Sequence, residues 1–424
     1  MANQFGDEKL RAGIQAAADR MNLDEERVPA YTLPPVAREG VATGPAFQSI
    51  QRQRLLKLFE DNMYGRIPPR CESLLFVTTA NDTGAFGGLA TRREISIVCR
   101  HAGIERTLRM LLYIPNAATG PVPAFFGLNF QGNHACTTDS GATFYPFERF
   151  PTMNTVRYED NRADESGRGK QAHRWDFEKV LSHGFASATI CYYDMYPDRP
   201  DGFDRSIMPM FYTRSQWESP ERDSGSISAW AWGIQRALDC LEAQPEIDCR
   251  RISVHGHSRL GKTALWAGAN DQRIALTVSN CSGTAGAKMH HRYYGENFEW
   301  IAVWNKHWMR PAFVSWVGRE LASGFDQHQL MALVAPRLLY VASATEDKYA
   351  DPKGEFASAL AASEAYRLLG GEGLPDEARQ PGFTPQPGNL IAGDIAYYLR
   401  AGKHDFTPEN WDALLSFAES RLNP

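Results

Sequence analysis

The sequence predicts an α/β protein, a three-layer sandwich in which a mostly parallel central sheet lies between helices. Over most of the 424 residues, short apolar runs alternate with segments of helical spacing, and this alternation is typical of a parallel sheet. In the clearest unit, a buried strand over Arg251 to Val254 leads through a tight turn into a helix over Lys262 to Ala269. Ser258 stands in that turn, which we expect at the carboxyl edge of the sheet.

The chain is expected to fold as one domain. Hydrophobic residues make up 43% of it, enough for a sizeable core, and neither an internal repeat nor a second domain boundary stands out. Arg27 to Phe47 is rich in proline and lacks periodicity. We therefore expect an extended N-terminal arm over residues 1–48 and a single catalytic domain over 49–424.

The first half of this domain should begin with a helix and continue into an antiparallel edge of the sheet. Ile50 to Met63 has helical spacing, and Gly65 and two prolines follow it. Four strands are then expected, the first three separated by Gly or Asn turns and the fourth more buried: Leu74 to Thr79, Arg93 to Cys99, Thr107 to Ile114 and Pro123 to Gly127.

The second half alternates helices and strands. We expect helices over Trp175 to Ser182, Ser226 to Ala243 and Trp411 to Leu422, and strands over Ala186 to Tyr193, Ile274 to Val278 and Arg337 to Ala342. Two irregular stretches interrupt the pattern. Phe147 to Gly169 is polar and should form a long surface loop. Met195 to Asp223 contains Met208, Phe211, Tyr212 and Trp217, which form either a satellite core or an aromatic rim.

Charge and composition exclude several classes of protein. The net charge is −5 without a Lys/Arg-rich run, so we expect no nucleic-acid partner. No apolar run is long enough to cross a bilayer, and Met1 to Leu10 lacks the apolar segment of a signal peptide. The seven cysteines show no C-x-x-C spacing, which argues against structural zinc. We expect neither membrane association nor a cofactor, and a monomer.

Two chemistries fit the turn at Ser258. As a nucleophile elbow, it would raise the serine hydroxyl toward an acyl carbon beside the amides of a helix N-terminus. As a phosphate loop, it matches G-x-x-x-x-G-K-[ST] through Gly256, Gly261, Lys262 and Thr263. An ordinary turn between a strand and a helix is the remaining interpretation.

The order of later residues favours the hydrolase. Such sheets place an acid and then a histidine at the ends of strands that follow the serine. Asp347 follows the strand predicted over Arg337 to Ala342, and His404 precedes the terminal helix. A phosphate loop needs a magnesium-binding aspartate, usually downstream, whereas Asp194 lies upstream. A phosphate-loop NTPase therefore stays a remote alternative.

Other polar residues have less specific interpretations. His255 and His257 could share one face of a strand as metal ligands, with His134 and His290–His291 as further candidates. No convincing acid completes the set, so no catalytic metal is expected. The loop from Leu128 to His134 follows a predicted strand. It could supply oxyanion donors or form a hydrogen-bonded turn.

The sequence resembles the glucuronoyl esterases of carbohydrate esterase family fifteen, especially their bacterial branch, from about Tyr64 to the C-terminus. Leu260 occupies the place where ordinary hydrolases carry glycine, two residues after the serine. The motifs that carry the resemblance are Gly256 to Lys262, Gly127 to His134, Ser282-Gly283, Tyr294 to Glu296, Asp347 to Pro352 and Gly402-x-His404. The resemblance implies an α/β-hydrolase fold.

By the same resemblance, the enzyme hydrolyses esters between (4-O-methyl-)glucuronic acid and an alcohol, as in bonds between lignin and glucuronoxylan. Ser258 would form the acyl-enzyme, His404 would transfer the proton, and Arg259 would help to hold the oxyanion. Lys262 and Glu296 would bind sugar hydroxyls. Activity on acetyl xylan or another carbohydrate ester is the alternative. The resemblance also implies a secreted or periplasmic enzyme.

Two positions depart from the family pattern. Many fungal members carry the triad acid just before Ser-Gly, where this chain has Cys281. Asp347 matches the alternative bacterial position, with its neighbour Glu346 as a less suitable substitute. Tyr349 replaces the tryptophan with which the family contacts the sugar, so stacking area and the indole donor are lost.

Overall fold

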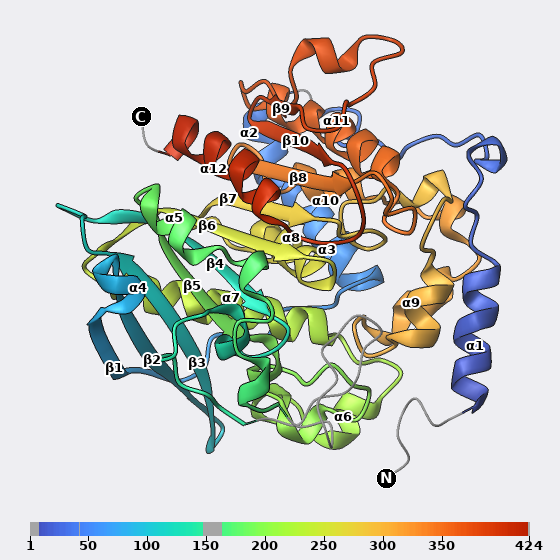
Figure 1. Ribbon diagram of the computed structural model, residues 1–424. Coiled ribbons are helices and arrows are strands. Elements are labelled where there is room, and N and C mark those ends of the chain that lie inside the picture. The colour runs from blue at the N-terminus through green and yellow to red at the C-terminus, as the bar shows by residue number, and fades with distance from the viewer. Residues whose placement is uncertain (1–7, 42, 147–162, 423–424) are drawn as a thin grey trace.

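A ten-stranded sheet runs through the whole molecule (Figure 1), with its strands in the order β1-β2-β3-β5-β4-β6-β7-β8-β10-β9. The computed structural model describes residues 8–41, 43–146 and 163–422. The strands are β1 (Ser73–Gly84), β2 (Ala90–His101), β3 (Ile104–Pro115), β4 (Val122–Asn129), β5 (Ala186–Cys191), β6 (Ile247–His257), β7 (Ile274–Asn280), β8 (Leu338–Ala344), β9 (Leu390–Ala392) and β10 (Ile395–Arg400).

The centre of the sheet is parallel and its edges are antiparallel. Strands β5, β4, β6, β7, β8 and β10 run parallel to their neighbours in that series. At one edge β1, β2 and β3 are antiparallel, and β3 pairs antiparallel with β5. At the other edge β9 turns back on β10. The prediction of a mostly parallel sheet with an antiparallel edge is confirmed.

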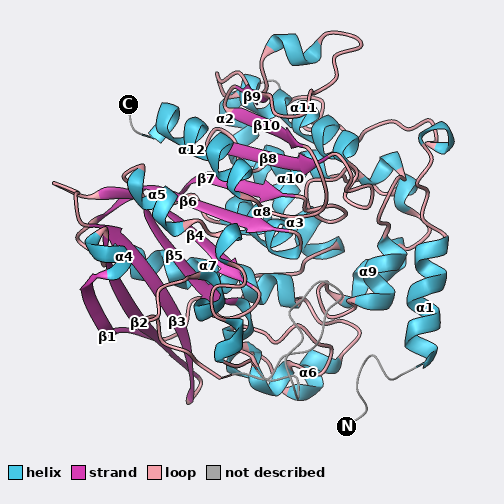
Figure 2. Ribbon diagram, in the orientation of Figure 1, coloured by secondary structure: helices cyan, strands magenta, loops and turns pink. Residues whose placement is uncertain are grey.

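Helices cover both faces of the parallel part, as Figure 2 shows with helices in cyan and strands in magenta. Successive residues of a strand point to opposite faces, and Phe125 and Phe126 of β4 accordingly belong to different apolar clusters. The Phe125 cluster includes α5 (Phe177–Ser182) and α12 (Pro408–Leu422). The Phe126 cluster includes α3 (Arg52–Asn62), α7 (Ser226–Glu242), α8 (Arg259–Asn270), α10 (Gln327–Ala332) and α11 (Pro352–Leu368). The predicted three layers are confirmed.

The N-terminal segment differs from the extended arm that its prolines suggest. It begins with a helix, α1 (Glu8–Asp19), whose residues are mostly good helix formers. In Figure 1, α1 stands beside α9 (Phe298–Trp304). Arg20, just after α1, forms two hydrogen bonds of 2.6 and 2.9 Å to Glu299. The proline-rich part is irregular apart from a short helical stretch that leads into α3. The division into an arm and one catalytic domain stays a prediction.

Several elements were not anticipated from the sequence. These are β9, β10, the short helices α2 (Gly44–Ala46), α4 (Ala85–Gly88) and α6 (Arg214–Glu218), and helices α9, α10 and α11. In the stretch from Met195 to Asp223, Met208 and Trp217 are buried in the main core, so they form neither a separate satellite core nor an aromatic rim. Most of the loop expected over Phe147 to Gly169 lies outside the described residues. Among the helices described, none combines the length and the apolar character needed to cross a membrane.

Candidate active site

Ser258 occupies a strained turn between β6 and α8. Its backbone has φ 58° and ψ −128°, a conformation that costs a non-glycine residue about 1–3 kcal/mol. Its amide donates to the Asn280 carbonyl at 2.9 Å, which ties the turn to β7. Position 256 must be glycine, because a Cβ there would lie 2.0 Å from the Leu260 carbonyl oxygen. The helix begins at Arg259, and the amides of a first helical turn lack acceptors within the helix.

His404 and Asp347 meet beside Ser258. The His404 Nδ1 atom lies 2.6 Å from the Asp347 Oδ2 atom. Two parallel strands place them: Asp347 follows β8, and His404 follows β10. Backbone bonds join the two loops, since Thr345 donates to the Arg400 carbonyl at 2.9 Å and Glu346 to that of Gly402 at 2.8 Å. The Glu346 side chain is exposed, whereas Asp347 is buried.

One cavity of about 250 Å³ contains these residues. Its lining includes Ser258, Asp347 and His404 together with Arg259, Lys262, Glu296 and Tyr349. The structure therefore brings together all seven residues that the sequence singled out for chemistry or substrate binding. A cavity of about 780 Å³ lies on the other side of the loop that carries Asp347. Size does not identify the site, because neither Ser258 nor His404 lines that larger cavity.

Arg259 is fixed beside Ser258 by a buried carboxylate. Its guanidinium forms an ion pair with Asp198 and lies 4.9 Å from the centre of the Trp308 ring. Asp198 also binds the Trp308 indole at 2.7 Å and the His307 ring at 2.8 Å. Burial disfavours a charged guanidinium, but the Asp198 carboxylate raises the pKa of Arg259 above its ordinary value. Arg259 lines the cavity together with Ser258, so its guanidinium is placed to donate to an anion that develops there.

Lys262 and Glu296 place a second polar pair in the cavity. The Lys262 ammonium donates to the Ser282 carbonyl and lies 3.5 Å from the Glu296 carboxylate. Burial lowers the pKa of Lys262, and the nearby Glu296 opposes that shift. Gly283 leaves space for Glu296, because a Cβ on it would lie 2.7 Å from a Glu296 oxygen. A charged donor and a charged acceptor thus stand side by side, an arrangement that suits a polyhydroxylated ligand.

Aromatic side chains form the wall that α9 contributes. Trp300 and Trp304 of α9 line the cavity with their ring centres 4.7 Å apart, and Trp308, which follows the helix, lines it as well. Tyr349 is 43% exposed and faces Trp300 with 6.2 Å between the ring centres. The sequence analysis did not identify these tryptophans. Their spacing along the chain, near Glu296, was the signal that could have found them.

Two further residues lie at the loop that follows β7. The sequence did not single out Glu355, and it assigned no role to Cys281. Glu355, on α11, is fully buried and accepts the amides of Ser282 and Gly283 at 2.8 and 2.9 Å. Burial raises its pKa to about 8. Cys281 is 2% exposed and lines the cavity beside Asp347 and His404. No pattern in the sequence connected Glu355 with a loop so far from it in the chain.

The other candidate motifs have structural roles. His255 is buried among aromatic rings, and His257 packs against His404 with 4.5 Å between the ring centres. His134 lies 3.1 Å from the Asp164 carbonyl. In the loop after β4, the Gly132 amide donates to its neighbour Asn129 at 2.8 Å, as expected for a hydrogen-bonded turn.

The phosphate-loop interpretation lacks its magnesium ligand. Asp194, the carboxylate considered for that role, pairs with Arg109 at 3.2 Å. Among the described residues, the one aspartate that lines the cavity of Lys262 is Asp347, and it pairs with His404 at 2.6 Å. The lysine instead pairs with Glu296.

Comparison with known proteins agrees with this geometry. The family model described as "Glucuronyl esterase, fungi" matches residues 210–370. A carbohydrate esterase, MZ0003, from an unknown prokaryotic organism is 39% identical over 420 residues, which cover 96% of this chain and 94% of that protein. The 4-O-methyl-glucuronoyl methylesterase of Hypocrea jecorina is 26% identical over 76% of this chain and 58% of its own length.

Solved structures give the same relationship. A glucuronoyl esterase from Solibacter usitatus superposes with a TM-score of 0.85 at 37% identity, over 94% of this chain and 99% of that one. A structure described as a promiscuous CE15 esterase from the marine bacterial metagenome gives a TM-score of 0.84 at 38% identity, over the same shares of the two chains. The resemblance and the α/β-hydrolase fold predicted from the sequence are confirmed. The chain belongs to the glucuronoyl esterases of carbohydrate esterase family fifteen, which are carboxylic ester hydrolases.

Proposed function

We propose that this protein hydrolyses the ester between the carboxyl group of a (4-O-methyl-)glucuronic acid residue and an alcohol, as in cross-links between glucuronoxylan and lignin. The proposal rests on the residues that line one cavity. Ser258, His404 and Asp347 share it with the buried Lys262 and the half-buried Glu296, which lie 3.5 Å apart. A general esterase has no need of an ion pair beside its nucleophile, whereas a sugar offers hydroxyl groups to both charges.

In the proposed mechanism, the Ser258 hydroxyl attacks the ester carbonyl while His404 accepts its proton. Asp347, 2.6 Å from His404 Nδ1, stabilises the imidazolium that forms. The imidazolium then protonates the leaving alcohol, and a glucuronyl ester of Ser258 remains. Water, deprotonated by His404, attacks this ester and releases the free acid and the serine.

Arg259 and the first amides of α8 are the proposed oxyanion donors. The guanidinium is held in place by Asp198 before substrate arrives, so little reorganisation is needed as negative charge develops. The position of Arg259 in the lining of the cavity, together with Ser258, supports this role. A cation is also suited to a substrate that becomes an anionic acid on hydrolysis.

Lys262 and Glu296 are proposed to bind hydroxyl groups of the glucuronate ring, and Tyr349 to contact one of its faces. All three line the cavity. The exposed Tyr349 ring, together with the tryptophans of α9, provides the aromatic surface on which a sugar packs. A polymeric plant cell-wall substrate also supports the proposal that the enzyme acts outside the cytoplasm.

The test compares three esters with the purified enzyme: benzyl glucuronate, acetylated xylan and p-nitrophenyl acetate. The proposal expects the highest kcat/KM on benzyl glucuronate. Lys262→Met should lower kcat/KM on this ester far more than on p-nitrophenyl acetate, which has no sugar hydroxyls. Preference for acetylated xylan would instead favour an acetyl esterase and would overturn the proposed substrate.

A further inference from the structure

Cys281 stands where three different metal-ligand types converge. Its Sγ, a carboxylate oxygen of Asp347 and a ring nitrogen of His404 all lie within 4.8 Å of one another. The three residues follow neighbouring strands, β7, β8 and β10, so the sheet itself brings them together. The Cys281 backbone has φ 46°, and its amide donates to the Ala342 carbonyl at 2.7 Å. The thiol is thus held in place beside the histidine and the acid.

Thiolate, imidazole and carboxylate are the ligands that Zn²⁺ and the related Cd²⁺ bind in proteins. A tetrahedral zinc ion separates its donor atoms by roughly 3.5 Å, given Zn–ligand distances of about 2.0–2.3 Å. Asp347 and His404 are 2.6 Å apart in the free enzyme, so binding requires these two side chains to move apart by about 1 Å. All three residues line the cavity of about 250 Å³, which offers a path for the ion and room for a water ligand.

We propose that Cys281, Asp347 and His404 form a site for a thiophilic divalent cation, Zn²⁺ or Cd²⁺, and that its occupation reversibly inhibits the esterase. The metal forms bonds to Cys281 Sγ, to an Asp347 oxygen and to His404 Nδ1, the nitrogen on the Asp347 side. The thiol proton leaves to solvent, the single imidazole proton is transferred from Nδ1 to Nε2 through water, and no group changes oxidation state. The inhibition rests on the proposed role of His404, whereas the binding itself does not.

Inhibition follows from the short distance between Asp347 and His404. Asp347 and His404 lie 2.6 Å apart in the free enzyme, and a bound ion would occupy the space between them and the thiol. His404 would then be a metal ligand with a cation beside it, and a ring so placed is a weak base toward the serine hydroxyl. The thiol of Cys281 beside Asp347 and His404 thereby makes the site sensitive to metal.

A second cluster of possible ligands contrasts with this one. His290, His291 and Asp326 are also close together but fully buried. Asp326 already accepts the amides of both histidines, at 2.8 and 3.0 Å, and the His290 Nε2 lies 2.8 Å from the Ser323 hydroxyl. These contacts hold a turn of the chain, and none of the three residues lines the cavity of Ser258.

The test titrates the full-length enzyme with Cd²⁺ and follows two signals. The first is the ultraviolet charge-transfer absorption of a cadmium–thiolate bond, which does not depend on any substrate. The second is hydrolysis of benzyl glucuronate relative to the metal-free activity of the same variant. We expect the band and the inhibition to appear together, and a chelator to reverse both. Mg²⁺, which prefers oxygen ligands, should produce neither.

Two cysteine variants make the assignment specific. Cys281→Ser should abolish the band and weaken Cd²⁺ inhibition by more than about 100-fold, because a directly bound ligand is lost. Cys249→Ser, at an exposed cysteine, should leave both signals unchanged. Cys281→Ala serves as a second variant, and circular dichroism verifies that each is folded. A Cd²⁺ band that persists in Cys281→Ser or Cys281→Ala, or its absence from the wild type, would overturn the site. If the enzyme fails to hydrolyse glucuronate esters, the band still reports on the metal.

Discussion

The residue that decides the catalytic assignment is the partner of His404. The structure places Asp347 there, in the loop after β8, while the position after β7 holds Cys281. Burial raises the pKa of the Cys281 thiol well above its ordinary value. A neutral thiol cannot stabilise an imidazolium, so the carboxylate of Asp347 has to supply the charge.

Replacement of Asp347 tests this assignment. Asp347→Asn keeps the side-chain shape but removes the charge, and kcat on benzyl glucuronate should fall by about 10⁴-fold, as in other triads. Glu346→Gln removes the same charge from an exposed neighbour and should leave kcat near the wild-type value. Similar losses in the two variants would contradict the account, as would an Asp347→Asn enzyme of normal activity.

Arg259 and Lys262 should affect different kinetic constants. Arg259→Lys keeps a cation near Asp198 but loses the planar guanidinium, so kcat should fall by about 100-fold with little change in KM. Lys262→Met keeps the bulk of a buried side chain and should mainly raise KM, because a sugar contact binds ground state and transition state alike. Steady-state kinetics on benzyl glucuronate measures both constants. A raised KM in Arg259→Lys together with a lowered kcat in Lys262→Met would contradict the two proposed roles.

Among the secondary-structure elements, α11 positions the loop after β7, which forms part of the cavity lining. Its Glu355 accepts the amides of Ser282 and Gly283, and Ser282 in turn accepts a hydrogen bond from Lys262. The other Glu355 oxygen lies 2.5 Å from the Ser343 hydroxyl on β8. One buried carboxyl group therefore joins α11, β8 and the loop after β7, and the position of Lys262 depends on it.

This carboxyl group should make stability depend on pH. Burial raises the pKa of Glu355 from 4.5 to about 8, so the folded protein keeps a proton that the unfolded chain loses. The stabilisation is complete below pH 4.5 and declines as the pH rises toward about 8. Glu355→Gln mimics the protonated acid, so the free energy of unfolding of this variant should depend less on pH over that range. Urea titrations of wild type, Glu355→Gln and the exposed control Glu346→Gln measure the slopes; equal slopes in all three would contradict this role.

The sequence predicted the elements with strong local patterns and missed those defined by distant contacts. The strand before Ser258 and the helix after it were predicted because an apolar run, glycines and helix formers adjoin there. Strand β10, which positions His404, was missed although it is as buried as its neighbours. Its polar and aromatic residues lack an alternating pattern, and it pairs with β8, far from it in the chain. Helix α9 was missed for the same reason, because it is short and packs against α1.

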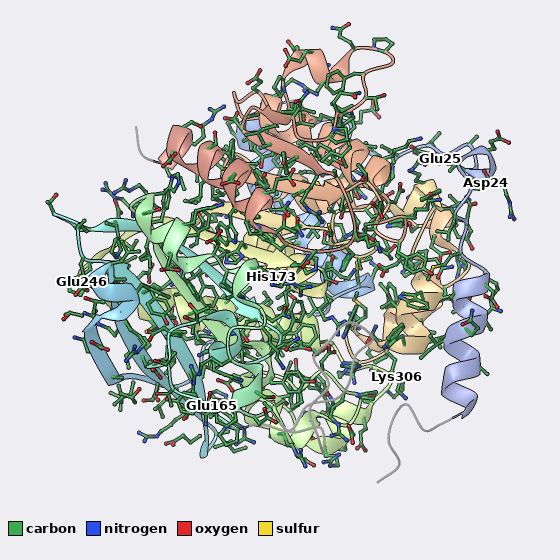
Figure 3. All side chains as sticks on the ribbon, viewed as in Figure 1. Asp24, Glu25, Glu165, His173, Glu246 and Lys306 are labelled. Carbon is green, nitrogen blue, oxygen red and sulfur yellow. The ribbon has the colours of Figure 1, made fainter. Side chains whose placement is uncertain are left out.

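At the scale of the whole molecule, the N-terminal segment supports the aromatic wall of the site. Helix α1 packs along α9, which carries Trp300 and Trp304, and Arg20 pairs with Glu299 at 2.6 Å. Further along, Glu25, labelled in Figure 3, forms an ion pair with Arg292. No pattern in the sequence indicated the contact between α1 and α9, because an amphipathic helix does not specify its partner.

Deletion of residues 1–20 should therefore weaken substrate binding more than chemistry. Without α1, α9 loses the surface against which it packs, and we expect KM for benzyl glucuronate to rise several-fold. Turnover of p-nitrophenyl acetate, a small ester without sugar contacts, should change little. Kinetics on the two esters with full-length and shortened enzyme checks this prediction. An unchanged KM would show that α9 holds its position alone.

The most direct test of the central claim is the turnover of benzyl glucuronate by Ser258→Ala. Because Ser258 is the proposed nucleophile of a cavity that also recognises the sugar, kcat/KM should fall by about 10⁴-fold or more. Circular dichroism should show an unchanged fold, because the substitution removes only a hydroxyl group. A folded Ser258→Ala enzyme that turns over this ester at a near-normal rate would contradict the proposed mechanism.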